Sequence, residues 1–255
     1  ITDFDREVGE AMAMVARSRA QDNTIFIYTS EQGSNFPHCK WTCYDTGLRT
    51  ALVIRWPGKI KPGSVTDAMV QYVDIVPTLL EAAGADPTKF NSGRPGAPVG
   101  SASDTGFDGR SFLDVLLGKA DSHREYTYGV HTTRGIINGS PSYPVRSIRS
   151  DRYKLIWNPQ HDKPFSNILQ TRGTELFWDS WKEAAKTDSV VKRRVTMYHT
   201  RPEFELYDLQ ADPYELVNLA DDPKLADAKA ELLPKLRAWM KQQGDEGIAT
   251  ELKAK

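Results

Sequence analysis

The sequence has little of what would assign it to several broad classes of protein. Its 255 residues include only two cysteines, too few for a disulfide framework. No apolar run approaches the roughly 18 residues of a membrane span, so we expect no transmembrane segment. The 33 basic and 34 acidic residues almost cancel, so there is no general attraction to nucleic acid or to anionic membranes. Any binding of anions must therefore be local.

The stretch that follows the first predicted strand concentrates residues that could carry chemistry. Residues 24–29 are rich in Ile, Phe, Tyr and Thr, which predicts a short buried strand. Glu31 and Gln32 come directly after it, where open α/β sheets place their chemistry, and Gly33 supplies a turn. A carboxylate beside an amide suits a hard divalent cation. On the residues alone, the same pair also fits an ordinary solvated turn.

Lys40 follows after a loop that contains His38. The compact ammonium group of Lys40 suits a tetrahedral anion held beside such a cation. His38 is a candidate substrate contact, and a solvated loop residue is the alternative. Residues 51–56 then predict a second apolar strand, which Pro57 ends.

Several segments resemble the C-terminal half of the type I, formylglycine-dependent sulfatases of the alkaline phosphatase superfamily. They are Glu31-Gln32-Gly33, Lys40-Trp41-Thr42 with Gly47 and Arg49, residues 55–63 (RWPGKIKPG), and the ELYDL pattern of residues 205–209. The resemblance implies an α/β fold. Residues 1–110 would form the C-terminal part of the large mixed sheet of the catalytic domain. Residues 111–255 would form a smaller α+β subdomain with an antiparallel sheet and a C-terminal helix.

The resemblance implies a hydrolase that removes sulfate, as ester or sulfamate, from a sulfated saccharide. It implies that Glu31 and Gln32 ligate Ca²⁺ and that Lys40 is the catalytic lysine that holds the sulfate. The family carries Asp-Asn, Asp-His or a related pair at this point, so the longer Glu31 side chain is a departure. The passage from residue 131 to residue 158 is most similar to the heparan N-sulfatase (sulfamidase) branch, which also includes bacterial enzymes that act on other sulfated polysaccharides.

The formylglycine motif of the family, Cys/Ser-x-Pro/Ala-x-Arg, fits neither Cys39 nor Cys43, which we predict to be packing residues. The resemblance therefore implies that the nucleophile lies in an N-terminal half, the expected partner of this chain, in a periplasmic, secreted or lysosomal enzyme. Two other functions stay open. One is a non-catalytic glycan-binding remnant, which the missing nucleophile permits. The other is a phosphoryl-transfer enzyme of the same superfamily, which would usually need more metal ligands.

Residues 126–130 predict a strand that ends at His131, with Arg134 in the turn beyond it. Both side chains would suit an anionic sugar, because Arg offers a planar fork for carboxylate or sulfate and His can donate a hydrogen bond or move a proton. Two solvated loop residues are the alternative.

The remaining patterns are structural. Residues 145–150 and 152–157 alternate apolar and basic residues, which predicts a hairpin whose Arg146, Arg149 and Arg152 lie in solvent. Asp74 is predicted to cap a helix rather than to bind a ligand. Other predicted elements are a helix over 174–186 in which Trp178 and Trp181 pack, a strand over 205–209 and a long final helix.

Overall fold

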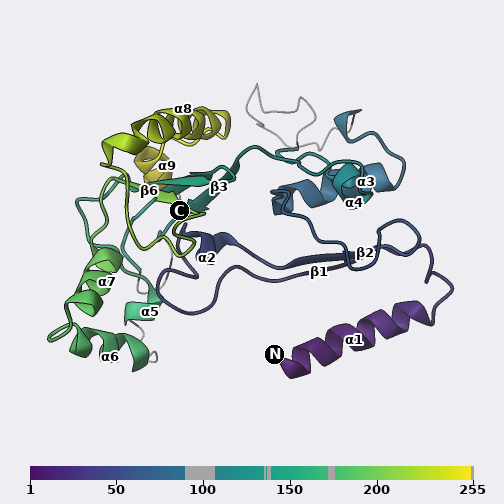
Figure 1. The fold of residues 1–255 in the computed structure, drawn as a ribbon, viewed down its shortest axis with the longest axis horizontal. Helices are drawn as coiled ribbons and strands as arrows, with labels where there is room; N and C mark the ends of the chain where they lie inside the picture. The colour runs from purple at the N-terminus through teal and green to yellow at the C-terminus, as the bar shows by residue number, and fades with distance from the viewer. Residues whose placement is uncertain (90–106, 135, 137–138, 172–175, 254–255) are drawn as a thin grey trace. The chain divides into compact units, whose positions relative to one another are not determined.

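The computed structural model describes residues 1–89, 107–134, 136, 139–171 and 176–253, and its ribbon is drawn in Figure 1. The chain divides into two structural units. The first unit contains residues 1–31, 50–89 and 107–124, and the second contains residues 32–49 and the described part of 125–253. The segment that carries Lys40 therefore folds with the C-terminal part of the chain. The domain boundary predicted between residues 110 and 111 stays a prediction, because the two units described here are defined by packing alone.

The first unit consists of two paired strands and short helices. Strands β1 and β2 are antiparallel, with Phe26 opposite Arg55. Their side chains Ile27, Ile54 and Trp56 line an apolar pocket together with Leu79 and Phe112 from the helical side. The elements are α1 (Thr2–Ala16), β1 (Phe26–Thr29), β2 (Leu52–Arg55), α3 (Ile75–Ala82) and α4 (Leu113–Leu116), with 3₁₀ turns at Tyr72–Asp74 and Pro87–Lys89.

Strands β1 and β2 begin and end within two residues of the strands predicted at 24–29 and 51–56. The expected burial differs, because β1 is half-buried with Thr29 exposed. Asp74 also acts differently from the prediction. It precedes α3, but its carboxylate accepts no hydrogen bond from that helix. The carboxylate binds the backbone of the preceding 3₁₀ turn instead, and it pairs with Arg124.

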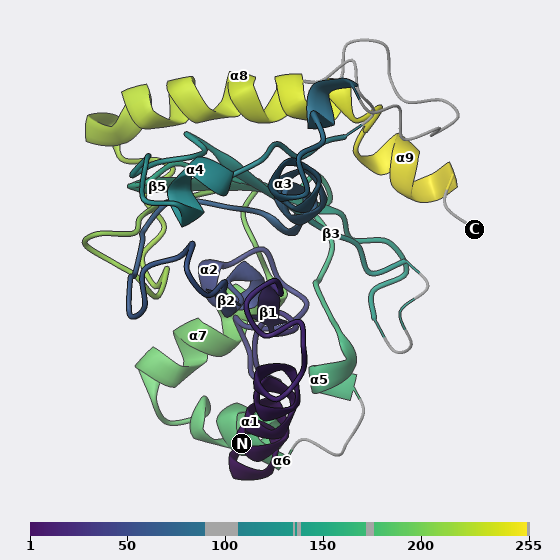
Figure 2. The ribbon, with the colours of Figure 1, turned by 90° about the vertical axis from the view of Figure 1, so that its right-hand side faces the viewer.

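The second unit is built on a four-stranded antiparallel sheet with the order β3-β4-β5-β6. Helix α8 packs on β4 and β5, as the ribbons show in two orientations (Figures 1 and 2). Its Leu232 and Leu236 join Ile148, Leu155 and Leu206 in one apolar cluster. The elements are β3 (Thr127–His131), β4 (Val145–Arg149), β5 (Tyr153–Trp157), β6 (Phe204–Asp208) and α8 (Ala226–Gln242).

The opposite face of this sheet carries a second cluster that is rich in aromatic rings. Because successive strand residues point to opposite faces, Val145, Ile156 and Tyr207 belong to this cluster, whereas their neighbours face α8. Trp178 is 2% exposed within it, so the packing predicted for this side chain is confirmed. The surrounding helices are α2 (Asp45–Leu48), α5 (Ile168–Thr171), α6 (Leu176–Ala184) and α7 (Ser189–His199). A 3₁₀ turn, Pro223–Leu225, directly precedes α8, and α9 (Ile248–Lys253) follows α8.

Three predictions are confirmed in the second unit. They are the hairpin of β4 and β5, the strand predicted at 205–209, which is β6, and the long helix near the end of the chain, which is α8. The solvent position predicted for Arg146 is wrong. This side chain is buried at 2% exposure and pairs with Asp245 and Glu251. Two carboxylates from residues about one hundred positions later therefore override the alternation that predicted exposure.

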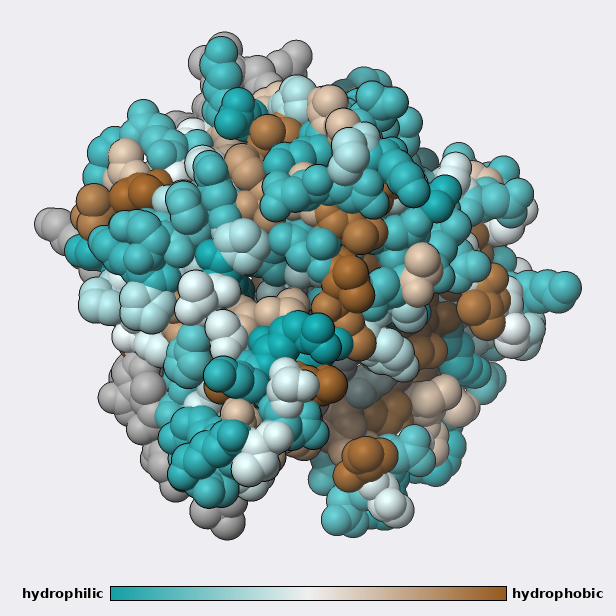
Figure 3. Space-filling view, turned by 60° about the vertical axis from the view of Figure 1, so that its left-hand side comes forward, coloured by the Kyte–Doolittle hydropathy of each residue, from teal (hydrophilic) through white to brown (hydrophobic). Residues whose placement is uncertain are grey.

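The face drawn in Figure 3 is largely hydrophilic, with hydrophobic residues visible between the polar ones. Among the helices that the structure describes, none has the length and apolar character needed to cross a membrane.

Candidate functional site

The loop of residues 33–47 is folded so tightly that only glycine fits at two of its positions. Gly33 has φ +47°, and a Cβ there would lie 2.7 Å from the backbone nitrogen of Lys40. A Cβ on Gly47 would lie 2.3 Å from the carbonyl oxygen of Cys39. Both contacts are too short for any side chain, so the two glycines allow the start and the end of the loop to approach its centre.

Lys40 lies at that centre between two residues in a rarely populated backbone conformation. His38 and Trp41 both have φ +63°, which costs on the order of 1 kcal/mol for each non-glycine residue. The surrounding loop holds this conformation in place. Thr46 donates to the carbonyl of His38 at 2.6 Å, and Thr42 donates to the carbonyl of Cys39 at 2.6 Å. Backbone strain of this kind is concentrated at functional sites, and the residue types of His38 and Trp41 do not predict it.

The lysine itself has a defined place in the loop. Its backbone N–H donates to the carbonyl of Ser34 at 3.1 Å. Its ammonium nitrogen lies 5.3 Å from the centre of the Trp41 ring, within the range of a cation–π contact. The side chain is half-buried. Lys40 is therefore presented on a braced loop rather than on a freely moving one.

The next turn of the chain fixes this loop to the sheet of the second unit. The hydroxyl of Tyr44 donates to Glu205 on β6 at 2.8 Å. The backbone N–H of Asp45 donates to Glu215 at 2.5 Å, and the Asp45 carboxylate lies 3.5 Å from the ammonium of Lys154 on β5. These contacts come from buried partners, so they give the Lys40 loop a rigid base.

His38 and His131 lie around the same aromatic cluster. His38 is 4.9 Å from the Tyr44 ring and 5.3 Å from the Tyr198 ring, and His131 is 6.2 Å from the Phe165 ring, all between centres. Burial lowers the pKa of His38 to about 3 and that of His131 to about 4, and the charge of Arg201 adds to both effects. Both imidazoles are therefore neutral at pH 7, when each can donate one hydrogen bond and accept another.

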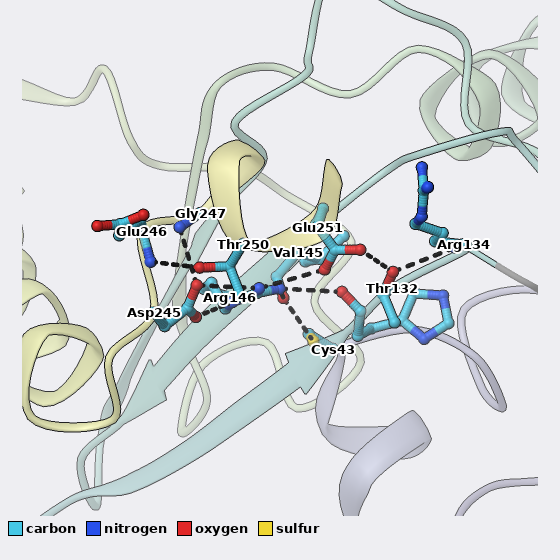
Figure 4. A network of polar contacts seen from close by, with 11 residues as sticks. Cys43, Thr132, Arg134, Val145, Arg146, Asp245, Glu246, Gly247, Thr250 and Glu251 are labelled. Carbon is cyan, nitrogen blue, oxygen red and sulfur yellow. Dashed lines mark hydrogen bonds and ion pairs between the residues drawn. The ribbon is translucent and has the colours of Figure 1, made fainter. Parts of the chain in front are cut away.

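The turn after β3 is tied to the last helix of the chain, as the close view in Figure 4 shows. The backbone N–H of Arg134 donates to the hydroxyl of Thr132 at 3.1 Å, and that hydroxyl also bonds to Glu251 on α9. Arg146 lies 3.2 Å from Glu251 and donates to the carbonyl of His131 at 3.2 Å. The buried Arg146–Glu251 pair therefore holds the backbone on both sides of Thr132.

Glu31 and Gln32 lie just after β1, with Ser30 between the strand and Glu31. Glu31 is the last residue of its segment in the first unit and is exposed, whereas Gln32 opens the segment that belongs to the second unit and is half-buried. Among the described residues, no group of three or more His, Cys, Asp or Glu side chains is placed to hold a metal ion. Because Ca²⁺ takes six to eight oxygen ligands, these two residues would supply a minority of them. Their assignment as ligands stays a prediction.

The cysteines of the loop differ in burial. Cys43 is fully buried in the aromatic cluster, and burial raises the pKa of its thiol to about 11. Cys39 is half-buried beside Lys40. The prediction of a packing role is confirmed for Cys43.

The sequence analysis missed Arg201, which the structure places among the rings that contact both histidines. Its guanidinium carbon is 3.8 Å from the centre of the Phe165 ring, 5.3 Å from Tyr44 and 5.5 Å from Tyr198. An Arg-Pro step just before a strand gives no indication of burial. Only the tertiary packing reveals that Arg201 is 2% exposed.

A family model matches the chain, and several curated relatives are named sulfatases. Residues 37–165, about half of the chain, match the family model described as N-sulphoglucosamine sulphohydrolase, C-terminal. An ulvan-active sulfatase of Formosa agariphila is 36% identical over 88% of this chain. The human N-sulphoglucosamine sulphohydrolase is 26% identical over 95% of it. The chain spans 39% and 46% of the lengths of these two relatives.

A solved structure supports the fold. It shows a protein in complex with its substrate D-glucosamine-2-N,6-O-disulfate, and it matches 95% of this chain with a TM-score of 0.63 at 24% sequence identity. The match covers 39% of that protein. The helices and antiparallel sheets described above are therefore the arrangement found in the C-terminal part of such a protein.

Proposed function

Because the chain belongs to the family of the N-sulphoglucosamine sulphohydrolase C-terminal region, a family of sulfatases, we propose that it forms the C-terminal part of an enzyme that removes sulfate from a sulfated saccharide. The observation that carries this proposal is the presentation of Lys40 between two left-handed residues on a braced loop. A fixed ammonium group of this kind stabilises the negative charge that gathers on sulfuryl oxygens during hydrolysis.

Different residues of this chain are proposed to bind the sulfate group and the saccharide. Lys40 binds and orients the sulfate group. His131 and Arg134 meet the saccharide, with His131 as a neutral hydrogen-bonding group because its pKa is lowered to about 4 by burial. His38 is held two residues before Lys40 on the same loop and contributes a further substrate contact. Neither Cys39 nor Cys43 fits the Cys/Ser-x-Pro/Ala-x-Arg motif, so the formylglycine nucleophile is proposed to come from an N-terminal half.

Glu31 and Gln32 are proposed to provide oxygen ligands for Ca²⁺, with the remaining ligands outside this chain. The fit is partial, since one carboxylate and one amide give too few donors by themselves. When bound, the ion would draw charge from the sulfuryl oxygens. A test that does not depend on turnover is the melting temperature of the complete enzyme with and without Ca²⁺. Stabilisation by Ca²⁺ is expected in the unaltered protein and lost in Glu31→Ala. Equal stabilisation in both proteins would contradict the assignment.

The catalytic assignment is tested in the complete enzyme with Lys40→Ala. We expect kcat/KM for a sulfated saccharide to fall by roughly a hundredfold or more, because one charge-stabilising donor is typically worth that much. Lys59→Ala is the matched control, since Lys59 is an exposed lysine after β2. Activity of Lys40→Ala within threefold of the control would overturn the role of Lys40.

A non-catalytic glycan-binding protein is the second candidate, and the mismatch of both cysteines with the formylglycine motif favours it. The mass of the native protein separates the two. An enzyme requires a species that carries formylglycine together with this chain. A stable 28.6 kDa protein that binds sulfated saccharides without hydrolysing them would support the binding protein instead.

A further inference from the structure

Arg201 is a buried charge whose hydrogen-bonding capacity is unused. It lies between α7 and β6, at 2% exposure. Its Nε and Nη2 atoms have no hydrogen-bond partner among the residues that the structure describes. Arg146 is equally buried but pairs with Asp245 and Glu251, which shows how this protein satisfies a buried guanidinium elsewhere. Leaving a buried cation without hydrogen bonds costs several kcal/mol, so the difference between the two arginines calls for a ligand.

The aromatic rings around Arg201 contact the plane of its guanidinium but offer no hydrogen-bond acceptor to its edge. The guanidinium carbon lies 3.8 Å from the centre of the Phe165 ring, which is the distance of direct stacking. Such a contact stabilises the charge through the ring face. It does not provide an acceptor for the N–H groups, which point along the plane of the guanidinium.

The acid that acts on Arg201 does not bind its edge. Burial opposes the charge of Arg201, but the nearby Tyr44 and Glu205 hold its pKa above the ordinary value, so it stays positive. The oxygens of Glu205 are already engaged. Oε2 accepts from the hydroxyls of Tyr44 and Tyr207 at 2.8 and 2.6 Å, and Oε1 accepts from Asn158 at 2.7 Å. Glu205 therefore balances the charge without occupying the fork.

Three other polar side chains around these rings also have buried atoms without partners in the described structure. They are Nε2 of His131, both ring nitrogens of His38, and the hydroxyl of Tyr143. His131 and Tyr143 rest on the ring that stacks on Arg201, at 6.2 and 5.2 Å between centres. The two histidines are half-buried, so this group of residues reaches the surface through them.

We propose that Arg201, His131 and Tyr143 bind a sulfate or carboxylate group other than the sulfate that Lys40 holds. The Nε and Nη2 atoms of arginine form a planar fork that matches two oxygens of such an anion. The neutral imidazole and the hydroxyl each offer one more donor. A sulfated or uronic sugar is one source of the anion, and in that form the inference rests on the proposed function. Binding of a free anion does not depend on it.

The test is isothermal titration calorimetry of the full chain with sodium sulfate and with sodium acetate, at a constant ionic strength set with sodium chloride. All proteins carry Lys40→Ala, so that the proposed catalytic site does not contribute. We expect both anions to bind and Arg201→Lys to weaken them by roughly tenfold, because lysine keeps the charge but not the fork. Arg193→Lys on α7 is the matched control, since Arg193 is exposed. Its affinity should be unchanged.

Two results would overturn the site: no binding above that of chloride, or the same affinity in Arg201→Lys and in the control. If circular dichroism shows that Arg201→Lys does not fold, Tyr143→Phe replaces it, because the Tyr143 hydroxyl has no partner to lose. A threefold weakening is then expected, and no change would count against the site. Glucosamine 6-sulfate and glucosamine complete the design. Tighter binding of the sulfated sugar than of sulfate identifies a saccharide site, and equal binding identifies a site for the free anion.

Discussion

The two units are stabilised in different ways. The second unit has an apolar cluster on each face of its sheet, and both clusters contain fully buried side chains such as Leu236 and Tyr198. In the first unit, α1 has no buried residue, and Val53 and Val76 are 60% and 52% exposed. Its fully buried centre is the carboxylate of Asp74. The second unit thus depends mainly on hydrophobic burial, whereas a charge network is central to the first.

Asp74 connects three segments of the first unit. Its oxygens accept backbone N–H groups of Gln71 at 2.8 Å and Arg110 at 2.9 Å. The guanidinium of Arg124 binds both oxygens, with Nε at 2.7 Å from Oδ2, and Nε2 of His123 lies 3.3 Å from Oδ2. A buried group with this many partners is expensive to remove, because each partner is left unsatisfied.

The largest expected effect therefore comes from Asp74→Ala. We expect a loss of about 3 to 5 kcal/mol, the usual cost of removing one partner of a buried ion pair. Hydrogen exchange should show the loss in peptides from 71–82 and 107–117 rather than in β4 to β6. Asp86→Ala, an exposed carboxylate control, should stay within about 0.5 kcal/mol. Equal exchange in the two variants would refute the central role of Asp74.

The hydrophobic side of the comparison is tested with Leu236→Ala. This side chain on α8 is fully buried against the sheet, so its truncation should cost about 3 kcal/mol through lost burial and a residual cavity. Urea unfolding monitored by exchange in the second unit measures the change. Leu252→Ala is the control, since Leu252 on α9 is 57% exposed. A cost below about 1 kcal/mol for Leu236→Ala would show that the cluster matters less than its burial indicates.

The two units should also respond to pH in opposite directions. Burial would raise the pKa of Asp74, but the hydrogen bonds from Arg124 and the nearby His123 side chain outweigh it and hold that pKa well below the usual range. The stability that Asp74 provides is present above the unfolded pKa and is lost as pH falls below it.

Burial raises the pKa of Glu215 to about 7 despite the ammonium of Lys154 at 3.6 Å. Because folding favours the protonated form of Glu215, its contribution to the stability of the second unit is greatest below about pH 4.5 and declines as pH rises toward 7.

We expect the Glu215 contribution to decline by on the order of 2 kcal/mol between about pH 4.5 and pH 7. Denaturant unfolding of the unaltered chain and of Glu215→Gln across this range measures it, since the variant has no carboxyl to titrate. The difference in stability between the two proteins should change with pH. A constant difference would show that the carboxyl of Glu215 does not titrate in this range.

The smallest effect is expected for Glu251→Gln. The amide keeps the size of the side chain, and Arg146 still has Asp245, so the loss should be about 1 kcal/mol. If His131 and Arg134 contact the saccharide, KM should rise severalfold in the complete enzyme while kcat is kept. Glu246→Gln is the control, because its salt bridge to Lys253 is exposed. An unchanged KM would mean that Glu251 does not position the substrate-binding turn.

Local patterns predicted the strands and helices well, because they depend on neighbouring residues. The hairpin of β4 and β5 follows from alternating residues around Asp151, and the final helix follows from its apolar spacing. The same alternation gave the wrong environment for Arg146. Its partners Asp245 and Glu251 come from a distant segment, and nothing near Arg146 in the sequence indicates them.

The candidate site was predictable only in part for the same reason. A resemblance identified Lys40, but the left-handed backbone of His38 and Trp41 is invisible in residue types that seldom adopt it. Arg201 was missed because its role arises from rings brought together by folding, including Phe165 and Tyr198. Asp74 was predicted to cap a helix because its neighbours in the sequence suggest nothing else. Its actual partner Arg124 is fifty positions away, so no local pattern indicates it.

The contrast between the two thiols offers a practical reporter. Cys43 is sealed within the aromatic cluster with a thiol pKa raised to about 11 by burial, so alkylating reagents should not modify it in the folded chain. Cys39 retains some exposure immediately before Lys40. The rate of maleimide labelling would therefore report on Cys39 alone. Slower labelling in the presence of a sugar would show that the sugar binds at the Lys40 loop, without any measurement of turnover.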